Sequence, residues 1–383
     1  MSVRGEELQI FRDSVRRFVE REVAPHVDGW EEQGNFPSSI FRKLGDNGFL
    51  GILVDESWGG VGGSYSLAGA WCEEFGRVRS VGFTTAVNMH SVVVTAALAR
   101  VGTEAAKEAW LRQAVSGEKI GAYAFTEPGA GSDLASIQTR AVRDGSDYII
   151  NGAKTFITNG ARADFVLVLA KTEPDRGYGG FTTFVVDAKT PGFSVSRKLS
   201  KLGWHASDTA ELTFADMRVP GAMMLGNVNE GWYRAMESLN WERMMLTLNA
   251  LGGAKACLEQ TVQYVNDRKV FGRSIGKFDQ TRHVLSTLSS QLRAGESYCD
   301  HILQLLDDGV DCVREAALAK LYVCELAIEV ADRCLQLHGG YGYTTEFSPE
   351  RWLRDLRLNT IGGGTSEVMR TIALKELGLL ARA

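Results

Sequence analysis

The chain opens with a spacing of apolar residues that is typical of amphipathic helices. Leu8, Phe11, Val15 and Phe18 recur at three- and four-residue intervals, which places them on one face of a helix. The helical spacing of apolar residues continues beyond Phe18, and we predict an N-terminal helical domain over residues 1–118. A glycine-rich run at 59–63 has neither the strand nor the helix that flanks the phosphate-binding turn of a dinucleotide fold. We interpret it as a loop between helices.

Strand-like runs replace the helical pattern in the next part of the chain. They are short, rich in β-branched and aromatic residues, and separated by Gly, Asn and Asp. Four such runs cover 148–150, 165–170, 181–186 and 211–214, and the last alternates polar and apolar residues. The sequence therefore predicts a small antiparallel sheet or barrel, as a central β-domain over residues 119–228.

Long helices are predicted for the remainder, residues 229–383. No proline occurs between Pro220 and Pro349, as uninterrupted helices require. Apolar residues from Val313 to Leu335 step by three and four, which predicts a single helix of roughly six turns that ends at two glycines, 339 and 340. We therefore expect an α+β chain of three domains, the last of them a C-terminal helical bundle.

Composition narrows the class of protein. An apolar content of 44% and a charged content of 23% are ordinary for a folded domain, and a net charge of −5 argues against a nucleic-acid-binding surface. We see no apolar run of about 18 residues and no signal-peptide core, so we expect no membrane span. Six scattered cysteines without a Cys-x-x-Cys pair fit a reducing cytoplasm better than a disulfide framework or a zinc site.

Five short segments could carry chemistry. The first, 123–133, combines Pro128, Gly129 and Gly131 with the hydroxyls of Thr126 and Ser132. A loop of this kind exposes N–H groups that can bind carbonyl or phosphate oxygens, although taken alone it is more often a structural turn. The other four segments are 154–160, 268–272, 336–340 and 365–367.

Taken together and in this order, the five segments resemble the acyl-CoA dehydrogenase family over the whole chain. The resemblance implies the acyl-CoA dehydrogenase fold, with an N-terminal α-helical domain, a central β-domain and a C-terminal four-helix bundle. It also implies noncovalent FAD, an acyl-CoA substrate, an electron-transferring flavoprotein as acceptor, and a homotetramer or homodimer. Fatty acid or branched-chain amino acid catabolism would be its setting. A carrier-protein thioester is an alternative to the CoA thioester that the sequence does not exclude.

The resemblance also assigns roles to individual residues. Those expected to contact FAD are Tyr123, Phe125, Thr126, Ser132, Phe156, Ile157, Thr158, Arg268, Phe271, Gln280, Gln336, Leu337, Gly339, Gly340, Thr365 and Glu367. Phe156 stands at the flavin-stacking position, and Thr158 would bond flavin N5. Seven of these residues, those between positions 268 and 340, would reach the FAD of a neighbouring subunit, and the guanidinium of Arg268 would bind its pyrophosphate. The residues expected to contact substrate are Ser132, Asn240, Arg243 and Gly364.

The usual catalytic base of the family is missing. Straight-chain members carry roughly Tyr-Glu-Gly-Thr near the C-terminus, where this chain has Gly362 and Gly363 at the Tyr and Glu positions. Dehydrogenation needs a base for the weakly acidic α-proton and hydrogen-bond donors for the thioester carbonyl. Gly363 keeps its backbone N–H as such a donor. Glu242, followed by Arg243, matches a minority of the family, including isovaleryl-CoA and long-chain enzymes, that carries its base on this helix.

The expected reaction is therefore removal of the α-proton by Glu242, while the β-hydrogen leaves as hydride to flavin N5 and a trans-2-enoyl thioester forms. Apolar neighbours such as Trp241 and Met244 would raise the pKa of the Glu242 carboxyl toward a useful range, whereas a solvated ion pair is the alternative. The glycines leave room for a branched or bulky acyl group. A different use of flavin, as in nitroalkane oxidases or desulfinases, and a non-catalytic flavin- or CoA-binding scaffold are the other classes that the sequence allows.

Overall fold

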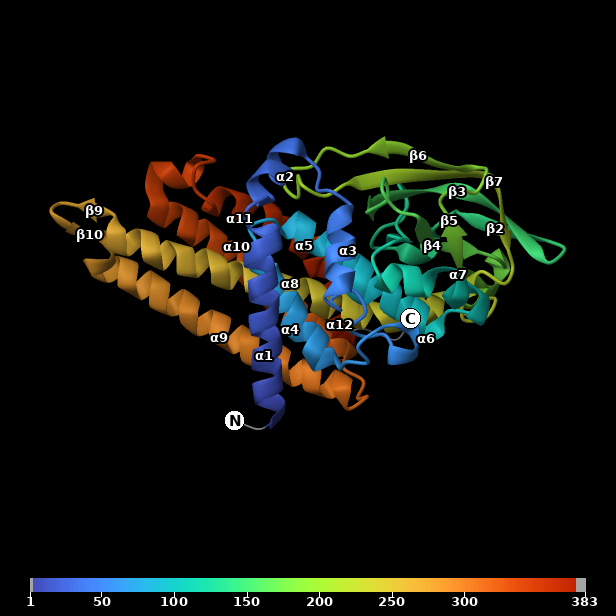
Figure 1. Ribbon diagram of the computed structural model, residues 1–383, viewed down its shortest axis with the longest axis horizontal. Coiled ribbons are helices and arrows are strands. Elements are labelled where there is room, and N and C mark those ends of the chain that lie inside the picture. Colours follow the sequence, from blue (N-terminus) through green and yellow to red (C-terminus); the bar gives the residue numbers. More distant parts are fainter. Residues whose placement is uncertain (1–2, 377–383) are drawn as a thin grey trace.

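Three regions follow one another along the chain in the computed structural model, which describes residues 3–376. Figure 1 shows the long helices α8 (Gly231–Asp267) and α9 (Asp279–Asp307) extending to one end of the molecule and the β-sheet at the other. The N-terminal helices lie between and in front of them. The expected order of helices, strands and helices is confirmed.

The N-terminal region is helical. Its elements are α1 (Val3–Phe18), η1 (Val19–Val23), α2 (Val27–Gln33), α3 (Ser39–Asp46), η2 (Glu56–Trp58), α4 (Tyr65–Gly76), α5 (Val81–Asn88), η3 (Met89–Val94), α6 (Thr95–Val101) and α7 (Glu104–Val115). The predicted apolar face of α1 is confirmed, since Val15 and Phe18 are buried and Leu8 and Phe11 are partly buried. The hydroxyls of Ser64, Ser80 and Thr103 cap α4, α5 and α7 by accepting a backbone N–H.

One helical stretch of this region, Val81–Val101, has the length and apolar composition of a membrane span. Within its most apolar window, however, 94% of the residues are buried inside the protein. It is packed as a core helix, and its central turn η3 is π-helical, a local widening that is frequent at functional sites.

The central region is an eight-stranded sheet with the order β6-β7-β3-β2-β4-β5-β8, to which β1 adds beside β4. The strands are β1 (Gly121–Ala124), β2 (Arg140–Asp144), β3 (Asp147–Thr158), β4 (Phe165–Lys171), β5 (Phe181–Asp187), β6 (Phe193–Lys198), β7 (Thr209–Pro220) and β8 (Met224–Leu225). The four predicted runs are confirmed as parts of β3, β4, β5 and β7. The pairing is antiparallel as expected, except that β1 and β2 each pair with β4 in parallel. Two short turns, η4 (Leu134–Ser136) and η5 (Pro174–Gly180), lie in the connections.

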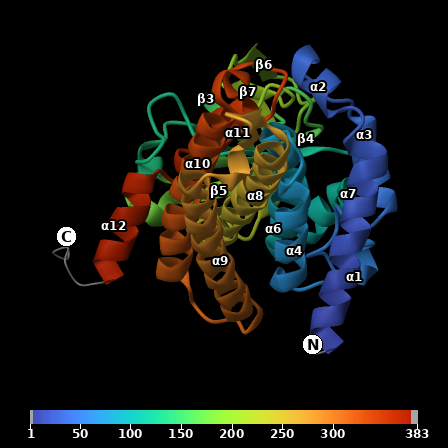
Figure 2. The ribbon, with the colours of Figure 1, turned by 90° about the vertical axis from the view of Figure 1, so that its left-hand side faces the viewer.

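The C-terminal region returns to helices. Besides α8 and α9 it comprises β9 (Lys269–Val270), β10 (Arg273–Ser274), η6 (Ile275–Lys277), α10 (Val313–His338), η7 (Gly339–Tyr343), α11 (Pro349–Leu356), η8 (Arg357–Thr360) and α12 (Ser366–Glu376). The single long helix predicted from the apolar spacing is confirmed as α10, and Gly339, with φ +61°, ends it. Seen from the bundle end in Figure 2, α8, α9 and α10 pack side by side, with α1 and α4 on one flank and α12 on the other.

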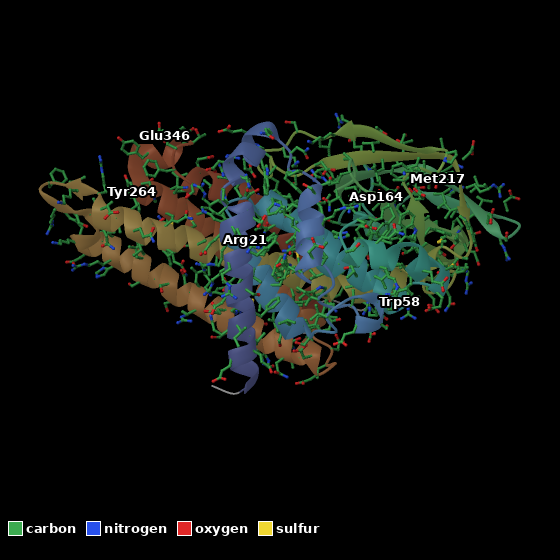
Figure 3. The ribbon with its side chains drawn as sticks, in the orientation of Figure 1. Arg21, Trp58, Asp164, Met217, Tyr264 and Glu346 are labelled. Carbon is green, nitrogen blue, oxygen red and sulfur yellow. The ribbon has the colours of Figure 1, made fainter. Side chains whose placement is uncertain are left out.

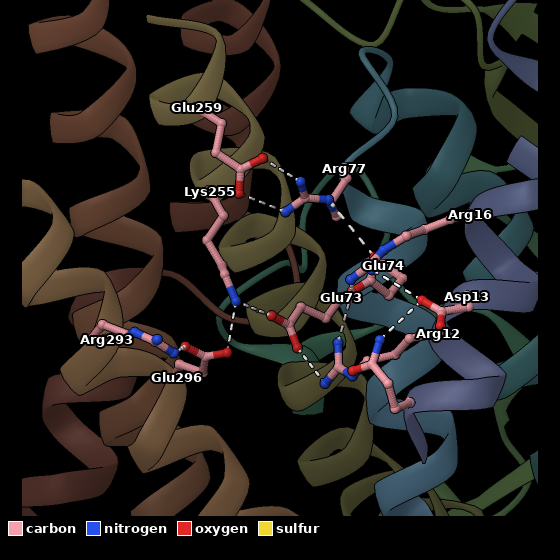
Figure 4. A network of polar contacts seen from close by, with 11 residues as sticks. Arg12, Asp13, Arg16, Glu73, Glu74, Arg77, Lys255, Glu259, Arg293 and Glu296 are labelled. Carbon is pink, nitrogen blue, oxygen red and sulfur yellow. Dashed lines mark hydrogen bonds and ion pairs between the residues drawn. The ribbon is translucent and has the colours of Figure 1, made fainter. Parts of the chain in front are cut away.

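A network of charged side chains joins the bundle to the N-terminal helices (Figure 4). Lys255 on α8 pairs with Glu73 on α4 (2.6 Å) and with Glu296 on α9 (2.7 Å), and Arg12 on α1 pairs with Glu73 (2.8 Å) and Glu74 (3.2 Å). Burial alone would raise the pKa of Glu73, but the two cations outweigh that effect and lower it. Four helices from two regions are thus tied through one buried carboxylate.

Candidate functional site

Glu242 lies in the part of α8 that packs against the N-terminal region. Its neighbours Met244, Met245 and Leu246 are buried, and the indole N–H of Trp241 donates to the carbonyl of Val92 in η3 (2.8 Å). The residue keeps some contact with solvent, yet desolvation dominates its carboxyl group and raises its pKa from 4.5 to about 6. This is the shift expected from the apolar surroundings.

Gly363 faces this carboxylate from the loop before α12. A Cβ built on Gly363 would lie 3.8 Å from Oε1 of Glu242, so the carboxylate reaches the space next to position 363. The same Cβ would stand 2.6 Å from Cδ1 of Leu246, and the backbone has φ +65°, which L side chains rarely adopt. Within residues 3–376 the N–H of Gly363 makes no hydrogen bond and is free to donate.

Asn240 and Arg243 lie on the same stretch of α8. One Nη of Arg243 donates to Oδ1 of Asn240 (3.0 Å), while its buried Nε has no partner in the described part of the chain. A turn earlier, Ser238 shares a hydrogen bond with the hydroxyl of Tyr123 (2.9 Å), which ties β1 to α8. Burial raises the pKa of Tyr123 and lowers that of Arg243.

Lys320 on α10 is a residue of this site that the sequence analysis missed. Its side chain is 1% exposed, and Nζ donates to the carbonyls of Gly364 (2.7 Å) and Asn359 (3.0 Å). The signal was present, because Lys320 stands three residues after Ala317 and four before Cys324, on the apolar stripe of the predicted helix. A lysine at such a position is almost never buried without partners.

Segments 123–133 and 154–160, which the sequence predicts to contact FAD, are joined by a buried ion pair. Lys154, fully buried, donates to Oε1 of Glu127 (2.9 Å) and to the carbonyl of Phe125 (2.9 Å). Glu127 also accepts the backbone N–H groups of Gln138 (2.5 Å) and Thr139 (3.0 Å). Burial lowers the pKa of Lys154 to about 8, although Glu127 opposes the shift. The loop after β1 and the end of β3 therefore form one rigid unit.

Phe156 is the most unusual residue of that unit. Its φ is +59°, it falls at a register shift between β3 and β7, and its side chain is 67% exposed. An aromatic residue in this backbone region is strained, and such strain is concentrated at functional sites. The N–H of Thr155 donates to the carbonyl of Thr126 (2.9 Å), Ile157 is buried and Thr158 is half-buried. Ser132 is exposed in the neighbouring loop before η4.

A second group of predicted residues lies at the far end of the bundle, around a cavity of about 440 Å³. Its lining is Tyr264, Arg268, Val270, Ile275, Gln336, Leu337, His338, Gly339, Gly340, Tyr341 and Thr344. Phe271 and Gln280 lie outside the lining: Phe271 is 95% exposed on the β9–β10 hairpin, and Gln280 is exposed at the start of α9. Five of the seven predicted residues of this group thus share one cavity.

The two groups lie far apart within one chain. Arg268 directly follows the last residue of α8, so Glu242 and Arg268 are about 39 Å apart along that helix at 1.5 Å per residue. In Figure 3 Tyr264, which lines the cavity, and Asp164 of the sheet region are likewise well separated along the long axis. Within one chain the cavity is therefore remote from Glu242.

Thr365 and Glu367 lie beside the Gly363 loop, at the start of α12. Thr365 is half-buried, and its Oγ1 accepts the N–H of Val368 (3.3 Å), so this hydroxyl caps the helix. Glu367 is exposed. Both are near the loop that holds the free N–H of Gly363 and away from the cavity at the bundle end.

Comparison with known proteins identifies the family. Three family models match: the acyl-CoA dehydrogenase N-terminal domain at residues 5–118, the middle domain at 122–217 and the C-terminal domain at 229–378. The mitochondrial long-chain specific acyl-CoA dehydrogenase of Sus scrofa is 39% identical over 97% of this chain and 86% of its own length.

Solved structures match as closely. An acyl-CoA dehydrogenase from Geobacillus kaustophilus has a TM-score of 0.94 and 41% identity, covering 97% of this chain and 98% of its own. A glutaryl-CoA dehydrogenase from Mycobacterium smegmatis in complex with FADH2 has a TM-score of 0.93 and 32% identity, covering 98% and 95%.

Proposed function

This chain belongs to the acyl-CoA dehydrogenase family and is an FAD-dependent oxidoreductase that acts on an acyl-CoA, and from this premise we propose that Glu242 is its catalytic base. The observation that supports the role most directly is the orientation of the carboxylate. It points to within 3.8 Å of the Cβ position of residue 363, where straight-chain members of the family carry their glutamate. A base on the helix can therefore serve the same substrate carbon as a base on the loop.

The residues around Glu242 suit proton abstraction. With a pKa of about 6, the carboxyl is ionised at neutral pH and still basic enough to take a proton from carbon. The free N–H of Gly363 would donate to the thioester oxygen as negative charge develops there. The Cα–H bond then breaks with its proton on Glu242, and its electron pair forms the Cα=Cβ bond as the β-hydrogen leaves with its own pair. FAD, when bound, accepts that hydride.

We propose that the cofactor is held by two subunits. The unit formed by segments 123–133 and 154–160 fits the flavin, since it exposes the ring of Phe156 and the loop backbone. The residues proposed to contact the flavin are Tyr123, Phe125, Thr126, Ser132, Phe156, Ile157 and Thr158, and we add Thr365 and Glu367 at the start of α12. The cavity at the bundle end fits the phosphates, since it combines Arg268 with the exposed backbone of Gly339 and Gly340. Because Arg268 lies about 39 Å along α8 from Glu242, beside which the flavin would have to lie to accept the hydride, the second group would serve the FAD of a partner in a homodimer or homotetramer.

Arg268→Ala tests this division of the site. We expect FAD to dissociate more readily from the variant, because a charged contact to the pyrophosphate is lost, while the unfolding temperature of the FAD-free protein stays unchanged, since Arg268 is exposed. Flavin absorbance after gel filtration measures the content, and Arg282→Ala, an exposed arginine on α9, is a suitable control. Full flavin retention in Arg268→Ala would contradict the assignment.

The substrate is proposed to be branched or bulky near Cα and Cβ. A Cβ at Gly362 would have only the carbonyl of Leu358 within 4 Å, at 3.8 Å, so the missing side chain leaves open space. Asn240, Arg243, Ser132 and Gly364 are the proposed acyl-CoA contacts. The unpaired Nε of Arg243 offers one buried donor for that purpose.

The deciding experiment compares Glu242→Gln with Glu237→Gln, an exposed carboxylate on the same helix. Both would be purified with FAD and assayed with a dye acceptor on butanoyl-, isovaleryl-, octanoyl-, palmitoyl- and 3-phenylpropionyl-CoA. We expect flavin reduction by one or more thioesters in the wild type and in Glu237→Gln, and almost none in Glu242→Gln. Wild-type turnover in Glu242→Gln would overturn the base assignment. A preference for straight chains would overturn the substrate proposal alone.

An electron-transferring flavoprotein is the proposed physiological acceptor. Reoxidation of the substrate-reduced enzyme by such a flavoprotein, followed by the flavin absorbance of both proteins, tests this step. If reoxidation is no faster than with oxygen alone, the acceptor is of another class. Turnover with an acyl-carrier-protein thioester but not with its CoA counterpart would replace the proposed carrier.

A further inference from the structure

We propose that Lys320 is a positioning residue for proton abstraction: it holds the loop 359–364 against α8, so that the N–H of Gly363 faces the thioester oxygen while the carboxylate of Glu242 faces the α-carbon of the same substrate. The inference rests on the proposed role of Glu242 as the base. It concerns a side chain on α10, whereas the base of the family is carried either on the helix that corresponds to α8 or on the loop before α12.

The hydrogen bonds of Lys320 single out this loop. Its ammonium donates to the carbonyl of Asn359, where the loop begins, and to that of Gly364, where it ends. Burying a charged amine costs free energy unless it is hydrogen-bonded, so these two carbonyls are the partners that make its burial tolerable. One side chain therefore clamps both ends of the turn that carries the N–H of Gly363.

The same loop is also tied to the helix of the base. Nδ2 of Asn359 donates to the carbonyl of Leu246 (3.2 Å), and Leu246 is four residues after Glu242, on the same face of α8. Lys320 and Asn359 thus connect α10, the loop and α8 in series. Cε of Lys320 lies 3.6 Å from the Cβ position of Gly363, which places the amine next to the donor that it is proposed to orient.

Charge gives Lys320 a second effect. The charged or titratable groups that act on Glu242 are Arg243 on its own helix, Lys320 on α10 and the phenol of Tyr123 on β1. Lys320 itself is acted on by Cys324 on its own helix and by Arg243 and Glu242 on α8. Desolvation raises the pKa of Glu242, and the cations Arg243 and Lys320 oppose that rise. Removing one of the two cations should therefore raise the pKa of Glu242 further.

The test compares Lys320→Met with Lys255→Met, a lysine on α8 whose partners belong to the helix network. With the acyl-CoA that the wild type turns over fastest among the five above, we expect kcat of Lys320→Met to fall at least tenfold while KM changes less than threefold. We also expect the acid limb of its kcat/KM profile to move to higher pH. Lys255→Met should keep the wild-type profile.

A readout that does not depend on turnover is the C=O stretching band of the matching trans-2-enoyl-CoA, labelled with ¹³C at the carbonyl and bound to the enzyme. A well-placed N–H of Gly363 polarises this carbonyl and lowers its frequency. In Lys320→Met the band should shift toward that of the free thioester. Lys320→Gln, which keeps a donor without the charge, should retain more of the band shift but still move the acid limb, and it serves if the Met variant does not fold.

The outcomes separate the two proposals. If Glu242→Gln turns over normally, the proposed function fails, whatever Lys320 does. A second outcome combines an inactive Glu242→Gln with a folded, FAD-containing Lys320→Met or Lys320→Gln that shows the wild-type acid limb and carbonyl band. In that case the positioning role alone is overturned. A variant that loses stability but neither of these signatures would show a purely structural lysine.

Discussion

Replacing Glu242 by Gln should make the protein both inactive and more stable. Burial raises the pKa of Glu242 from 4.5 to about 6, so ionising it in the folded state costs about 2 kcal/mol at 1.36 kcal/mol per unit. At neutral pH the wild type carries that cost and the neutral Gln variant does not. Turnover should fall by a factor of about 10² to 10⁴, the usual contribution of a general base.

The pH dependence of the stability gain follows from the direction of the shift. A carboxyl whose pKa is higher in the folded state favours folding less as pH rises through the interval from 4.5 to about 6. The Gln variant should therefore gain its full advantage above about pH 6, and the two proteins should converge below about pH 4.5.

Guanidinium unfolding at pH 7 and at pH 4.5, on protein with matched FAD content, measures this difference, and dye reduction measures the turnover. A stability difference between the Gln variant and the wild type that is the same at both pH values would show that the carboxylate is not desolvated. Wild-type turnover would refute the reasoning entirely, because a group that is not needed for proton transfer has no reason to be held at this cost.

Four other outcomes are expected. The kcat/KM of the wild type should fall about tenfold per pH unit below about pH 6, as the base is protonated, in a stopped-flow or dye assay. Combining Glu242→Gly with Gly363→Glu should restore part of the turnover lost in Glu242→Gly, but not all, because position 363 has a positive φ and little room for a Cβ. Lys154→Met should lower the free energy of unfolding by about 3–5 kcal/mol, since the buried carboxylate of Glu127 loses its cation and keeps only backbone N–H donors. It should also reduce the FAD content, measured by flavin absorbance. Lys255→Met should lower the free energy of unfolding by about 1–3 kcal/mol, a smaller loss than for Lys154→Met because Lys255 is partly exposed. Its turnover per bound FAD should not change.

Much of the fold was predictable because burial leaves a periodic trace. The stripe from Val313 to Leu335 gave α10 almost to the residue, and strands such as β4, buried along nearly their whole length, were evident as apolar runs. Strands of two residues, such as β8 and β9, are too short to show a period. The strand β6 is exposed over most of its length and lacks an apolar face.

The motifs of the proposed site are visible in the sequence, but the contacts between them are not. Lys320 and Asn359 are 39 positions apart, and no local pattern indicates that one donates to the carbonyl of the other. Likewise the identity of a phenylalanine does not indicate a positive φ, and Phe156 has one where β3 shifts register against β7. The separation of the two groups proposed to bind the cofactor depends on the direction in which α8 runs, and that is a property of the assembled fold.

The turn at Gly363 has an evolutionary consequence. A protein that carries its base on the helix could in principle return it to the loop by exchanging two residues, but here the loop residue has φ +65°, and Cδ1 of Leu246 stands 2.6 Å from where its Cβ would be. Intermediates on that path would combine a strained backbone with a steric clash before any carboxylate became useful. In a chain with Leu246 and this backbone, moving the proposed base from position 242 to position 363 would therefore need further substitutions besides those two, and the effect of each change would depend on the others.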